Sequence, residues 1–458
     1  MHEKMKNLLP TPLFALAKRC PYPLYVVGGA VRDLLAGLQS NDKRDWDICS
    51  PTPFDQFLTI AGECGFTAKS VFRSTGTVKL LDSENNEYEY CTFRSDKYVR
   101  GTHVPVEIFF TDDIQLDARR RDFTANAVYF DIKNVQFVDP LDGITAIKEK
   151  RLSTVAPARK VFGEDGLRLM RLSRQAACLG FTPDGDCLAG ARANANLIDD
   201  ITPERIYAEL KQILSADKKY GINDGHYRGL KLLDEIGVLE RILPELTLGK
   251  GMAQREDFHK YDVLEHSLRA VLYAEEEVRL AALLHDVGKP FCNLRDGNAY
   301  AHPQEGARIA TEILTRLKAS KKTIQRVHAL IQHHMYDMNC QTGENKLRRF
   351  FAANLDILDD LLLLKQADFS ACMDDLSPAP TCLRWQAVLE KMQEENAPLR
   401  IKELAVSGKE LLNADIPASY VATVLKGLLL HTTVNPTDNQ KERLIKIAQG
   451  IVKNLAEH

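Results

Sequence analysis

Several features that mark particular protein classes are missing from this sequence of 458 residues. No stretch approaches the roughly 18 uninterrupted apolar residues of a membrane-spanning helix, so we expect no association with a membrane. The first residues include no apolar core followed by a cleavage site, which argues against a secretory signal. No internal repeat or low-complexity tract is evident, which argues against a repeat protein or a disordered chain.

Paired cysteines and a strong net charge are also absent. The 10 cysteines are scattered singly without a Cys-x-x-Cys pair, which argues against a structural zinc site and fits free thiols in the cytoplasm. A net charge of −3 indicates no overall preference for polyanions, so any nucleic-acid surface must be local. The sequence gives no indication of oligomeric state. At roughly 100–200 residues per domain, its length allows about two to four domains.

One local basic region stands out against this background. It falls within residues 119–174 and is the candidate surface for a nucleotide or nucleic acid. Its members are Arg119, Arg120, Arg121, Lys148, Lys150, Arg151, Arg159, Lys160, Arg168, Arg171 and Arg174.

A glycine pair and an aspartate pair lie close together near the N-terminus. The apolar run Leu24–Val27 precedes Gly28-Gly29, and a turn of this kind lets backbone N–H groups approach a phosphate at the start of a helix. Asp45 and Asp47 stand two residues apart at the beginning of the next apolar run. Because strand side chains alternate between faces, the two carboxylates point the same way. The combination predicts Mg²⁺-dependent transfer to or from a nucleotide.

The hydrophobic pattern predicts an α+β protein with a mixed N-terminal sheet. Short β-rich runs extend to about residue 142, after which the apolar residues recur with a helical period. We predict a catalytic head at 1–142, an all-α neck at 143–250, a further helical domain at 251–375 and a C-terminal helical region at 376–458. The predicted strands are 24–27, 46–49, 77–81, 88–93, 104–110 and 135–138.

Further motifs follow the aspartate pair in a fixed order. Glu89 precedes Thr-Phe-Arg, Arg120-Arg121-Asp122 leads to Asn126, Asp139-Pro-Leu-Asp-Gly follows, and Glu164-Asp165-Gly-Leu-Arg168 opens a helical stretch. If that stretch is one helix, Asp165 and Arg168 are neighbours at i and i+3 and form either a base-reading pair or an ordinary salt bridge. The last motif is Pro203-Glu204-Arg205-Ile206. We expect Glu204 and Arg205 to brace the helices of the neck by side-chain pairing.

These motifs together resemble the class II tRNA nucleotidyltransferase (CCA-adding enzyme) and bacterial poly(A) polymerase family, a branch of the polymerase-beta-like nucleotidyltransferases. The resemblance implies that Asp45, Asp47 and Glu89 are catalytic and that the two aspartates bind Mg²⁺. It implies that Asp165 and Arg168 recognise the base of CTP and ATP without a template. The nucleotide-binding set that we predict comprises Gly28, Gly29, Arg32, Arg120, Asp122, Asn126, Asp165, Arg168, Arg171 and Arg174.

A second metal-binding pattern lies in the helical half. His285-Asp286 ends an apolar helix, His266 precedes it, and His302, His334 and Asp368 follow. This order resembles the HD phosphohydrolase superfamily. Imidazoles with carboxylates suit Mn²⁺, Ni²⁺, Co²⁺ or Fe²⁺, which can activate water against a phosphoester. We expect His266, His285, Asp286 and Asp368 to bind one ion, with His302 and His334 completing a second site.

The resulting hypothesis is an enzyme that adds CMP and AMP to the 3′ end of tRNA and that carries an HD domain. Within the same class, a poly(A) polymerase or an enzyme restricted to CC or A addition shares these motifs. From another class, an HD phosphohydrolase with a non-catalytic nucleotide-binding head is the alternative, and a purely structural RNA-binding protein fits less well.

Overall fold

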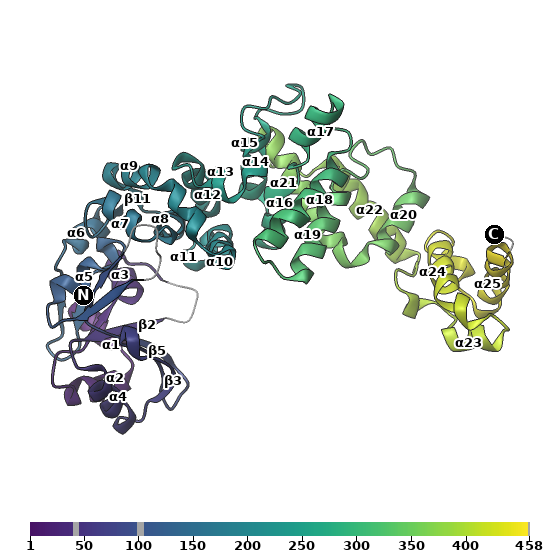
Figure 1. The fold of residues 1–458 in the computed structure, drawn as a ribbon. Coiled ribbons are helices and arrows are strands. Elements are labelled where there is room, and N and C mark those ends of the chain that lie inside the picture. The colour runs from purple at the N-terminus through teal and green to yellow at the C-terminus, as the bar shows by residue number, and fades with distance from the viewer. Residues whose placement is uncertain (40–44, 99–104, 457–458) are drawn as a thin grey trace. The chain divides into compact units, whose positions relative to one another are not determined.

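The computed structural model describes residues 1–39, 45–98 and 105–456 (Figure 1). These residues form two compact units. The first comprises Met1–Thr247 with Arg316–Ala319, and the second comprises Leu248–Thr315 with Ser320–His458. The division after Thr247 lies close to the predicted boundary at residue 250, whereas the boundaries at 142 and 375 remain predictions. None of the described helices is long and apolar enough to cross a membrane.

The first unit contains a seven-stranded mixed sheet in the order β3-β4-β5-β2-β1-β8-β9. The pair β2–β5 is parallel, and the other neighbours are antiparallel. A separate hairpin joins β6 and β7. The strands are β1 (Tyr25–Val27), β2 (Trp46–Ser50), β3 (Thr67–Phe72), β4 (Thr77–Leu81), β5 (Glu87–Thr92), β6 (Arg94–Lys97), β7 (Glu107–Phe110), β8 (Tyr129–Asp131) and β9 (Gln136–Val138).

Sequence patterning located most of these strands but missed β3, β6 and β8. Strand β3 is mostly exposed and therefore lacks the apolar alternation that identifies a half-buried strand. Strand β8 has only three residues, all buried, so it offers no alternation at all. Of the predicted run 104–110, residue 104 lies outside the described residues and β7 begins at Glu107.

Helices pack on the sheet through aromatic side chains. The ring of Phe57 in α4 stacks on Tyr90 of β5, with centroids 3.3 Å apart, and both residues are fully buried. Burial of such a side chain contributes about 1.5–3 kcal/mol. The helices of this part are α1 (His2–Leu8), α2 (Thr11–Arg19), α3 (Gly29–Ala36), α4 (Phe54–Glu63), α5 (Ile114–Arg119) and α6 (Gly143–Lys148).

The neck that follows is helical, with one exception to the prediction. Two short strands, β10 (Arg151–Leu152) and β11 (Thr182–Pro183), pair in parallel, so the neck is not all-α. Two-residue strands are too short to produce a periodic signal. The neck helices are α7 (Ala158–Glu164), α8 (Leu167–Leu179), α9 (Gly185–Ala193), α10 (Pro203–Leu214), α11 (Ala216–Tyr220), α12 (Gly225–Glu235), α13 (Leu239–Ile242) and α14 (Pro244–Thr247).

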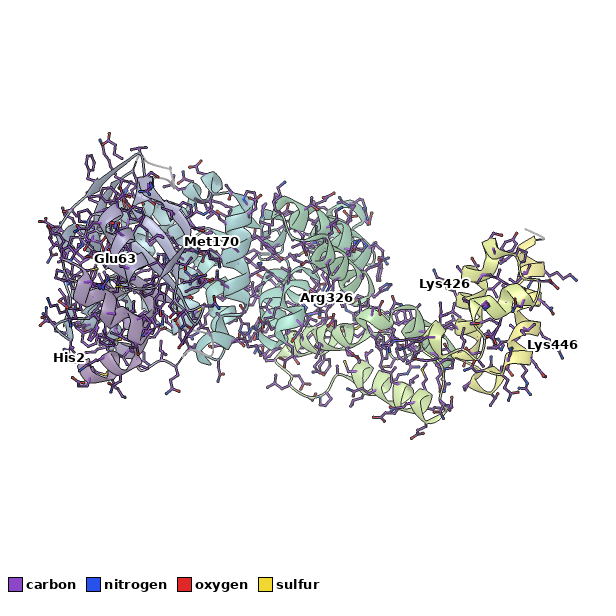
Figure 2. All side chains as sticks on the ribbon, turned by 90° about the horizontal axis from the view of Figure 1, so that it is seen from below. His2, Glu63, Met170, Arg326, Lys426 and Lys446 are labelled. Carbon is purple, nitrogen blue, oxygen red and sulfur yellow. The ribbon has the colours of Figure 1, made fainter. Side chains whose placement is uncertain are left out.

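The second unit is built from helices in its described part. Its centre is a packing of α15 against α16 and α21, and its last helices enclose a separate apolar core around Leu411, Leu428 and Leu444. Lys426 and Lys446 lie on the exposed faces of those last helices (Figure 2). The helices are α15 (Val263–Tyr273), α16 (Arg279–Leu284), α17 (Lys289–Asp296), α18 (His302–Arg316), α19 (Lys321–His333), α20 (Glu344–Ala353), α21 (Leu358–Met373), α22 (Pro380–Glu394), α23 (Gly408–Asn413), α24 (Val421–Thr432) and α25 (Lys441–Ala456).

Candidate active site and metal centre

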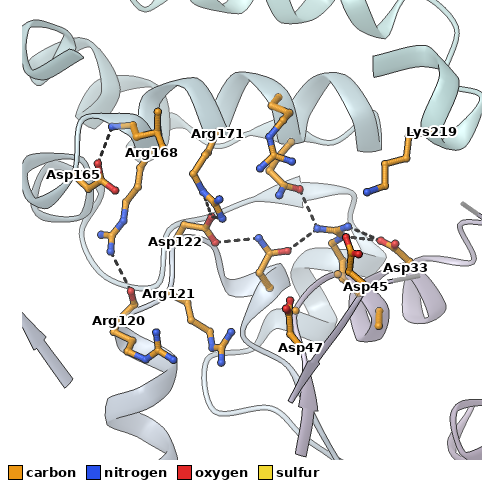
Figure 3. Close-up of a pocket in the computed structure, with 18 of the residues that line it drawn as sticks. Asp33, Asp45, Asp47, Arg120, Arg121, Asp122, Asp165, Arg168, Arg171 and Lys219 are labelled. Atoms are coloured by element: carbon orange, nitrogen blue, oxygen red, sulfur yellow. Dashed lines mark hydrogen bonds and ion pairs between the residues drawn. The ribbon is translucent and has the colours of Figure 1, made fainter. Parts of the chain in front are cut away.

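One cavity in the first unit collects nearly all the site residues predicted for the head and neck (Figure 3). Its volume is about 520 Å³, and Glu89 is the one predicted residue that does not line it. The predicted residues in its wall are Gly28, Gly29, Arg32, Asp45, Asp47, Arg120, Asp122, Asn126, Asp165, Arg168, Arg171 and Arg174.

The glycine turn is shaped by the neighbouring aspartate. Gly28 has a φ of +78°, which L side chains rarely adopt, and a Cβ atom there would lie 2.7 Å from Asp47 Oδ2. Gly29 then begins α3, so the backbone enters the helix directly beside the carboxylate. A side chain at position 28 would therefore disturb both the turn and Asp47.

The three predicted catalytic carboxylates lie together. Asp45 precedes β2, and Asp47 in β2 pairs in register with Glu89 of the parallel strand β5. Burial raises the pKa of Asp47 to about 6; Arg121 opposes this, whereas Glu89 and Asp45 add to it. Glu89 is half exposed and its carboxylate lies 3.8 Å from Lys79 Nζ. Three neighbouring carboxylates whose charges are only partly compensated fit the chemistry of a Mg²⁺ site.

The arginines after α5 are held by a buried aspartate that sequence reasoning did not single out. The Asp117 carboxylate is 2.7 Å from Arg120 Nε and 3.1 Å from Arg121 Nη2, and it accepts a hydrogen bond from Tyr129. Burial alone would raise its pKa, but the two guanidinium groups outweigh burial and lower the pKa of Asp117 to about 2. The arginines are thus oriented by an ionised side chain at the end of α5.

Asp122 and Asn126 link the head to α8. Arg171 donates to Asp122 Oδ2 at 2.5 and 2.9 Å, and the Asn126 amide donates to Asp122 Oδ1 at 3.0 Å. Burial acts to raise the pKa of Asp122, but Arg171 and Asn126 hold it well below its usual range. The Asn126 carbonyl in turn accepts from Arg32 Nη1 at 2.8 Å.

Arg32 occupies the centre of this network. It is 5% exposed, and it also donates to Gln175 and Asp33. Tyr220 of α11 donates to Asp33 at 2.6 Å, so the network reaches from α3 to the neck. Gln175 and Tyr220 line the cavity and were not predicted. Gln175 follows Arg168 by seven residues on α8, a spacing that could have identified it, whereas no local signal marks Tyr220.

Asp165 and Arg168 do not share a helix face, contrary to the expectation from their spacing. Asp165 lies between α7 and α8 in an extended conformation, and its Oδ1 accepts from Leu167 N at 2.9 Å. The guanidinium of Arg168 pairs with Glu164 at 2.9 Å, so the alternative of an i,i+3 salt bridge with Asp165 is wrong and an i,i+4 pair takes its place. The extended residue breaks the helical period that the spacing argument assumed.

Arg168 is fixed on several sides. Its guanidinium donates to the carbonyl oxygens of Val161 and Arg120, and it lies 5.6 Å from the centre of the Tyr98 ring. The residue is 6% exposed. By contrast, Asp165 Oδ2 has no hydrogen-bond partner within the described ranges.

The prediction that Glu204 and Arg205 brace the neck helices is wrong. Glu204 is exposed and Arg205 lines the cavity, so this pair does not brace the neck helices. That contact is made by Arg174 of α8 with Glu209 of α10, at 2.6 Å. Adjacent helix residues point in different directions, which explains why the two neighbours separate.

Two cations in the wall lack a carboxylate partner among the residues that the structure describes. They are Arg205 of α10 and Lys219 of α11. The Lys219 side chain points into the cavity (Figure 3). The other arginines that we named in the wall are each paired with a carboxylate. The charge available to an anionic ligand therefore lies mainly on the neck side.

All six predicted metal ligands of the second unit are buried, and their side chains lie close together. His266 Nε2 lies 3.0 Å from Asp368 Oδ1 and 3.2 Å from His285 Nε2, and His302 Nε2 lies 3.2 Å from His334 Nε2. The two resulting clusters are His266, His285 and Asp368, and Asp286, His302 and His334.

Asp286 connects the two clusters. Its Oδ2 lies 3.3 Å from His285 Nε2, and its Oδ1 lies 3.3 Å from His302 Nε2. The arrangement fits a pair of metal ions bridged by one carboxylate, with a donor set suited to transition metals. Lys289 also contacts Asp286 Oδ2 at 2.6 Å.

Three of the histidines have their second ring nitrogen fixed by the backbone. Nδ1 lies 2.7 Å from the carbonyl of Ala282 in His285, 2.7 Å from that of Ala299 in His302, and 2.6 Å from that of Ile331 in His334. Donation from Nδ1 leaves Nε2 as the metal-binding atom. Burial lowers the pKa of His334 to about 3, which keeps its ring neutral as metal binding requires.

Family models match three consecutive parts of the chain. "Poly A polymerase head domain" matches residues 24–153, "Probable RNA and SrmB- binding site of polymerase A" matches residues 180–248, and "HD domain" matches residues 263–368. Nucleotidyltransferase heads and HD domains generally use divalent metal ions.

Curated relatives and solved structures agree with these matches. A multifunctional CCA protein of Stenotrophomonas maltophilia is 30% identical over 68% of the chain and 75% of its own length. The fold resembles that of a Bacillus stearothermophilus CCA-adding enzyme solved with CTP, with a TM-score of 0.66, 24% identity and coverage of 98% and 100%. An A-adding tRNA nucleotidyltransferase of Deinococcus radiodurans is 31% identical over 90% of the chain and 93% of its own length. The chain therefore belongs to the tRNA nucleotidyltransferase and poly(A) polymerase family of enzymes and carries an HD domain.

Proposed function

We propose that this protein adds CMP and AMP, from CTP and ATP, to the 3′ end of tRNA without a nucleic-acid template. The observation that carries the proposal is that Asp45 and Asp47 line the same cavity as a cluster of arginines. The relatives named CCA-adding enzyme and multifunctional CCA protein support the same activity. We also propose a cytoplasmic location, where these substrates occur together and the ten free thiols stay reduced.

The carboxylates provide the reactive end of the cavity. Asp45 and Asp47, with Glu89 beside them, would hold Mg²⁺, which stabilises charge on the attacking and leaving oxygens when bound. The reaction joins the RNA 3′ oxygen to the α-phosphorus and breaks the bond to pyrophosphate. Gly28 and Gly29 bring backbone N–H groups to the phosphates.

The arginine side of the cavity would bind the nucleotide. We propose that Arg120, Arg171 and Arg174 contact phosphate or ribose oxygens, since guanidinium groups match phosphate geometry. Arg32, Asp122 and Asn126 form hydrogen bonds with one another and with their neighbours. They would therefore hold the arginines of this wall in position.

Asp165 and Arg168 would select the base. Asp165 Oδ2 can accept a hydrogen bond from the exocyclic amino group that C and A share and U lacks. Arg168, held by backbone carbonyls and stacked near Tyr98, would donate to the ring edge.

Arg205 and Lys219 would bind phosphates of the RNA 3′ end. Both lie in the segment matched by the probable RNA-binding model, and neither charge is compensated within the described structure. This assignment adds the end of α11 to the substrate surface.

Addition of A alone is a second candidate, because the relative covering 90% of the chain is an A-adding enzyme. The test supplies tRNA ending before C, after C, or after CC, with single labelled nucleotides and Mg²⁺, followed by sequencing of the 3′ ends. We expect nucleotide addition to the 3′ ends of all three RNAs. Growth only from the CC end would assign A addition, and long A tails would assign poly(A) polymerase activity.

The HD domain would hydrolyse phosphoesters with Mn²⁺, Ni²⁺, Co²⁺ or Fe²⁺. Support comes from the six buried ligands and the bridging position of Asp286. A non-catalytic head would leave this as the main activity. Nucleotide incorporation by the wild-type protein excludes that alternative.

A further inference from the structure

His266 differs from the other histidines of the HD centre. Its Nε2 faces Asp368 and His285, but its Nδ1 has no hydrogen-bond partner in the part of the chain that the structure describes. The residue is 0% exposed, so water does not satisfy this atom from the surface. A buried polar atom left unpaired costs about 1–3 kcal/mol, which indicates that Nδ1 has a ligand in the working protein.

Two further donors lie beside His266. The ring of His259 meets the ring of His266 edge to face, with centroids 4.9 Å apart, and Nδ1 of His259 is likewise buried and unpaired among the described residues. Single ligand atoms of His259, His266 and Cys372 all lie within 4.8 Å of one another. Two imidazoles and one thiol thus converge, and of these three only His266 also belongs to the HD ligand set.

The loop that carries His259 is fastened at this position. Lys260 N donates to the Cys372 carbonyl at 2.9 Å, which ties the loop to α21. The carboxylate of Asp374, which follows α21 directly, accepts hydrogen bonds from Tyr261, from Tyr273 at 2.8 Å and from Arg269. The donors are therefore held in place by their supporting contacts, as a binding site requires.

We propose that His259, Cys372 and Nδ1 of His266 form a Zn²⁺ site adjacent to the two HD clusters. Zinc prefers imidazole and thiolate ligands, and three protein ligands leave a fourth position open. On binding, the Cys372 thiol and the His266 ring each release one proton to solvent. The sulfur then bonds to the metal, and the resulting His266 imidazolate has a lone pair for a metal on each of its two nitrogens. His266 joins the new site to the HD centre, because its two nitrogens serve different metals. The inference does not depend on nucleotide addition.

Cobalt(II) is a direct probe of this site, because a thiolate ligand produces a sulfur-to-cobalt charge-transfer band that nitrogen and oxygen ligands do not. The full chain, stripped of metal and reduced, is titrated with Co²⁺ and then with Zn²⁺. We expect the band to appear and to be displaced by Zn²⁺. Its absence from the wild-type protein at saturating Co²⁺ would overturn the proposal.

The variants assign the band to Cys372. Cys372→Ser should lose the band and bind one metal equivalent fewer by elemental mass spectrometry, and His259→Gln should weaken cobalt binding. The matched control is Cys382→Ser, which alters another buried cysteine of this unit that joins no metal-binding cluster of described residues. A band that survives in Cys372→Ser, or disappears in Cys382→Ser, would contradict the site.

Discussion

At the residue scale, Asp47 carries an electrostatic cost that a bound cation would remove. Its carboxylate lies beside two other carboxylates, and burial raises its pKa from 3.8 to about 6. The folded protein therefore binds this proton more tightly than the unfolded chain does. Ionised Asp47 destabilises the metal-free protein above about pH 6, and the cost disappears as the pH falls below 3.8.

We expect Asp47→Asn to abolish nucleotide addition while stabilising the metal-free protein. Loss of a ligand to the reaction's cation should lower the rate by at least about 100-fold. In chelator, the variant should be roughly 1–3 kcal/mol more stable than wild type at pH 8 and equally stable near pH 4. Incorporation near the wild-type rate would contradict the catalytic assignment.

Asp165→Asn tests base selection with minimal disturbance. The amide oxygen can still accept from Leu167 N, but the group facing the cavity changes from an acceptor to a donor. We expect poorer use of CTP and ATP and better use of UTP, measured as kcat/KM for each nucleotide. An equal loss for all nucleotides would indicate a structural role alone.

Lys219→Met should weaken RNA binding without a comparable loss of kcat. Removal of one phosphate contact should raise the KM for tRNA several-fold and reduce the salt dependence of binding by about one counterion. Lys211→Met is the matched control, because Lys211 lies exposed on α10 and does not line the cavity. Equal effects of the two changes would remove Lys219 from the RNA surface.

At the scale of elements, the glycines at the two ends of α3 allow a comparison of backbone strain with the contact to Asp47. Gly28 precedes the helix and Gly37 follows it, with φ values of +78° and +68°. A Cβ atom at position 28 meets Asp47, whereas one at position 37 meets nothing within 4 Å. Gly37 has a ψ of +20° and lies in the left-handed helical region, whereas the ψ of −141° places Gly28 close to a region that essentially only glycine adopts. The same substitution therefore imposes more backbone strain at position 28, and only there does it meet the carboxylate.

We expect Gly37→Ala to lose about 1–2 kcal/mol of stability and Gly28→Ala to lose more. Only Gly28→Ala should lose nucleotide addition, because it displaces Asp47. Thermal unfolding and incorporation assays on both variants check this. Equal activity losses would show that α3 as a whole, and not the contact with Asp47, limits catalysis.

At the scale of the whole molecule, the two compact units offer different sets of candidate metal ligands. The head offers only oxygen ligands, whereas the HD clusters combine four histidines with two aspartates. Hard cations suit the first set and transition metals suit the second. The two activities should therefore respond separately to metals and to mutations.

The double substitution His285→Ala with Asp286→Ala should remove phosphohydrolase activity and leave nucleotide addition intact. Phosphatase and 2′,3′-cyclic phosphodiesterase assays with Mn²⁺, Ni²⁺ or Co²⁺ provide the readout, with Mg²⁺-dependent incorporation as the control. If the wild-type protein hydrolyses no phosphoester with any of these metals, the HD centre is not an active hydrolase.

Local sequence was sufficient for features that depend on neighbouring residues. The glycine turn before α3, the aspartates at β2 and the paired arginines after α5 were each predicted from a short motif, and the cavity contains them. The candidate ligands of the HD centre follow from the resemblance to the HD superfamily, and in the structure they meet in two clusters.

Tertiary structure decided which of these residues share contacts. Asp165 lies outside α8 in an extended conformation, so its side chain does not pair with that of Arg168, although Arg168 N donates to the Asp165 carbonyl at 3.1 Å. Arg205 turns to the cavity while Arg174 pairs with Glu209. Lys219 enters the site, and His259 meets Cys372, across more than a hundred residues of sequence in the latter case. Spacing along a chain determines side-chain direction only within one regular element. Contacts between distant elements depend on how their faces pack, so only the folded chain revealed them.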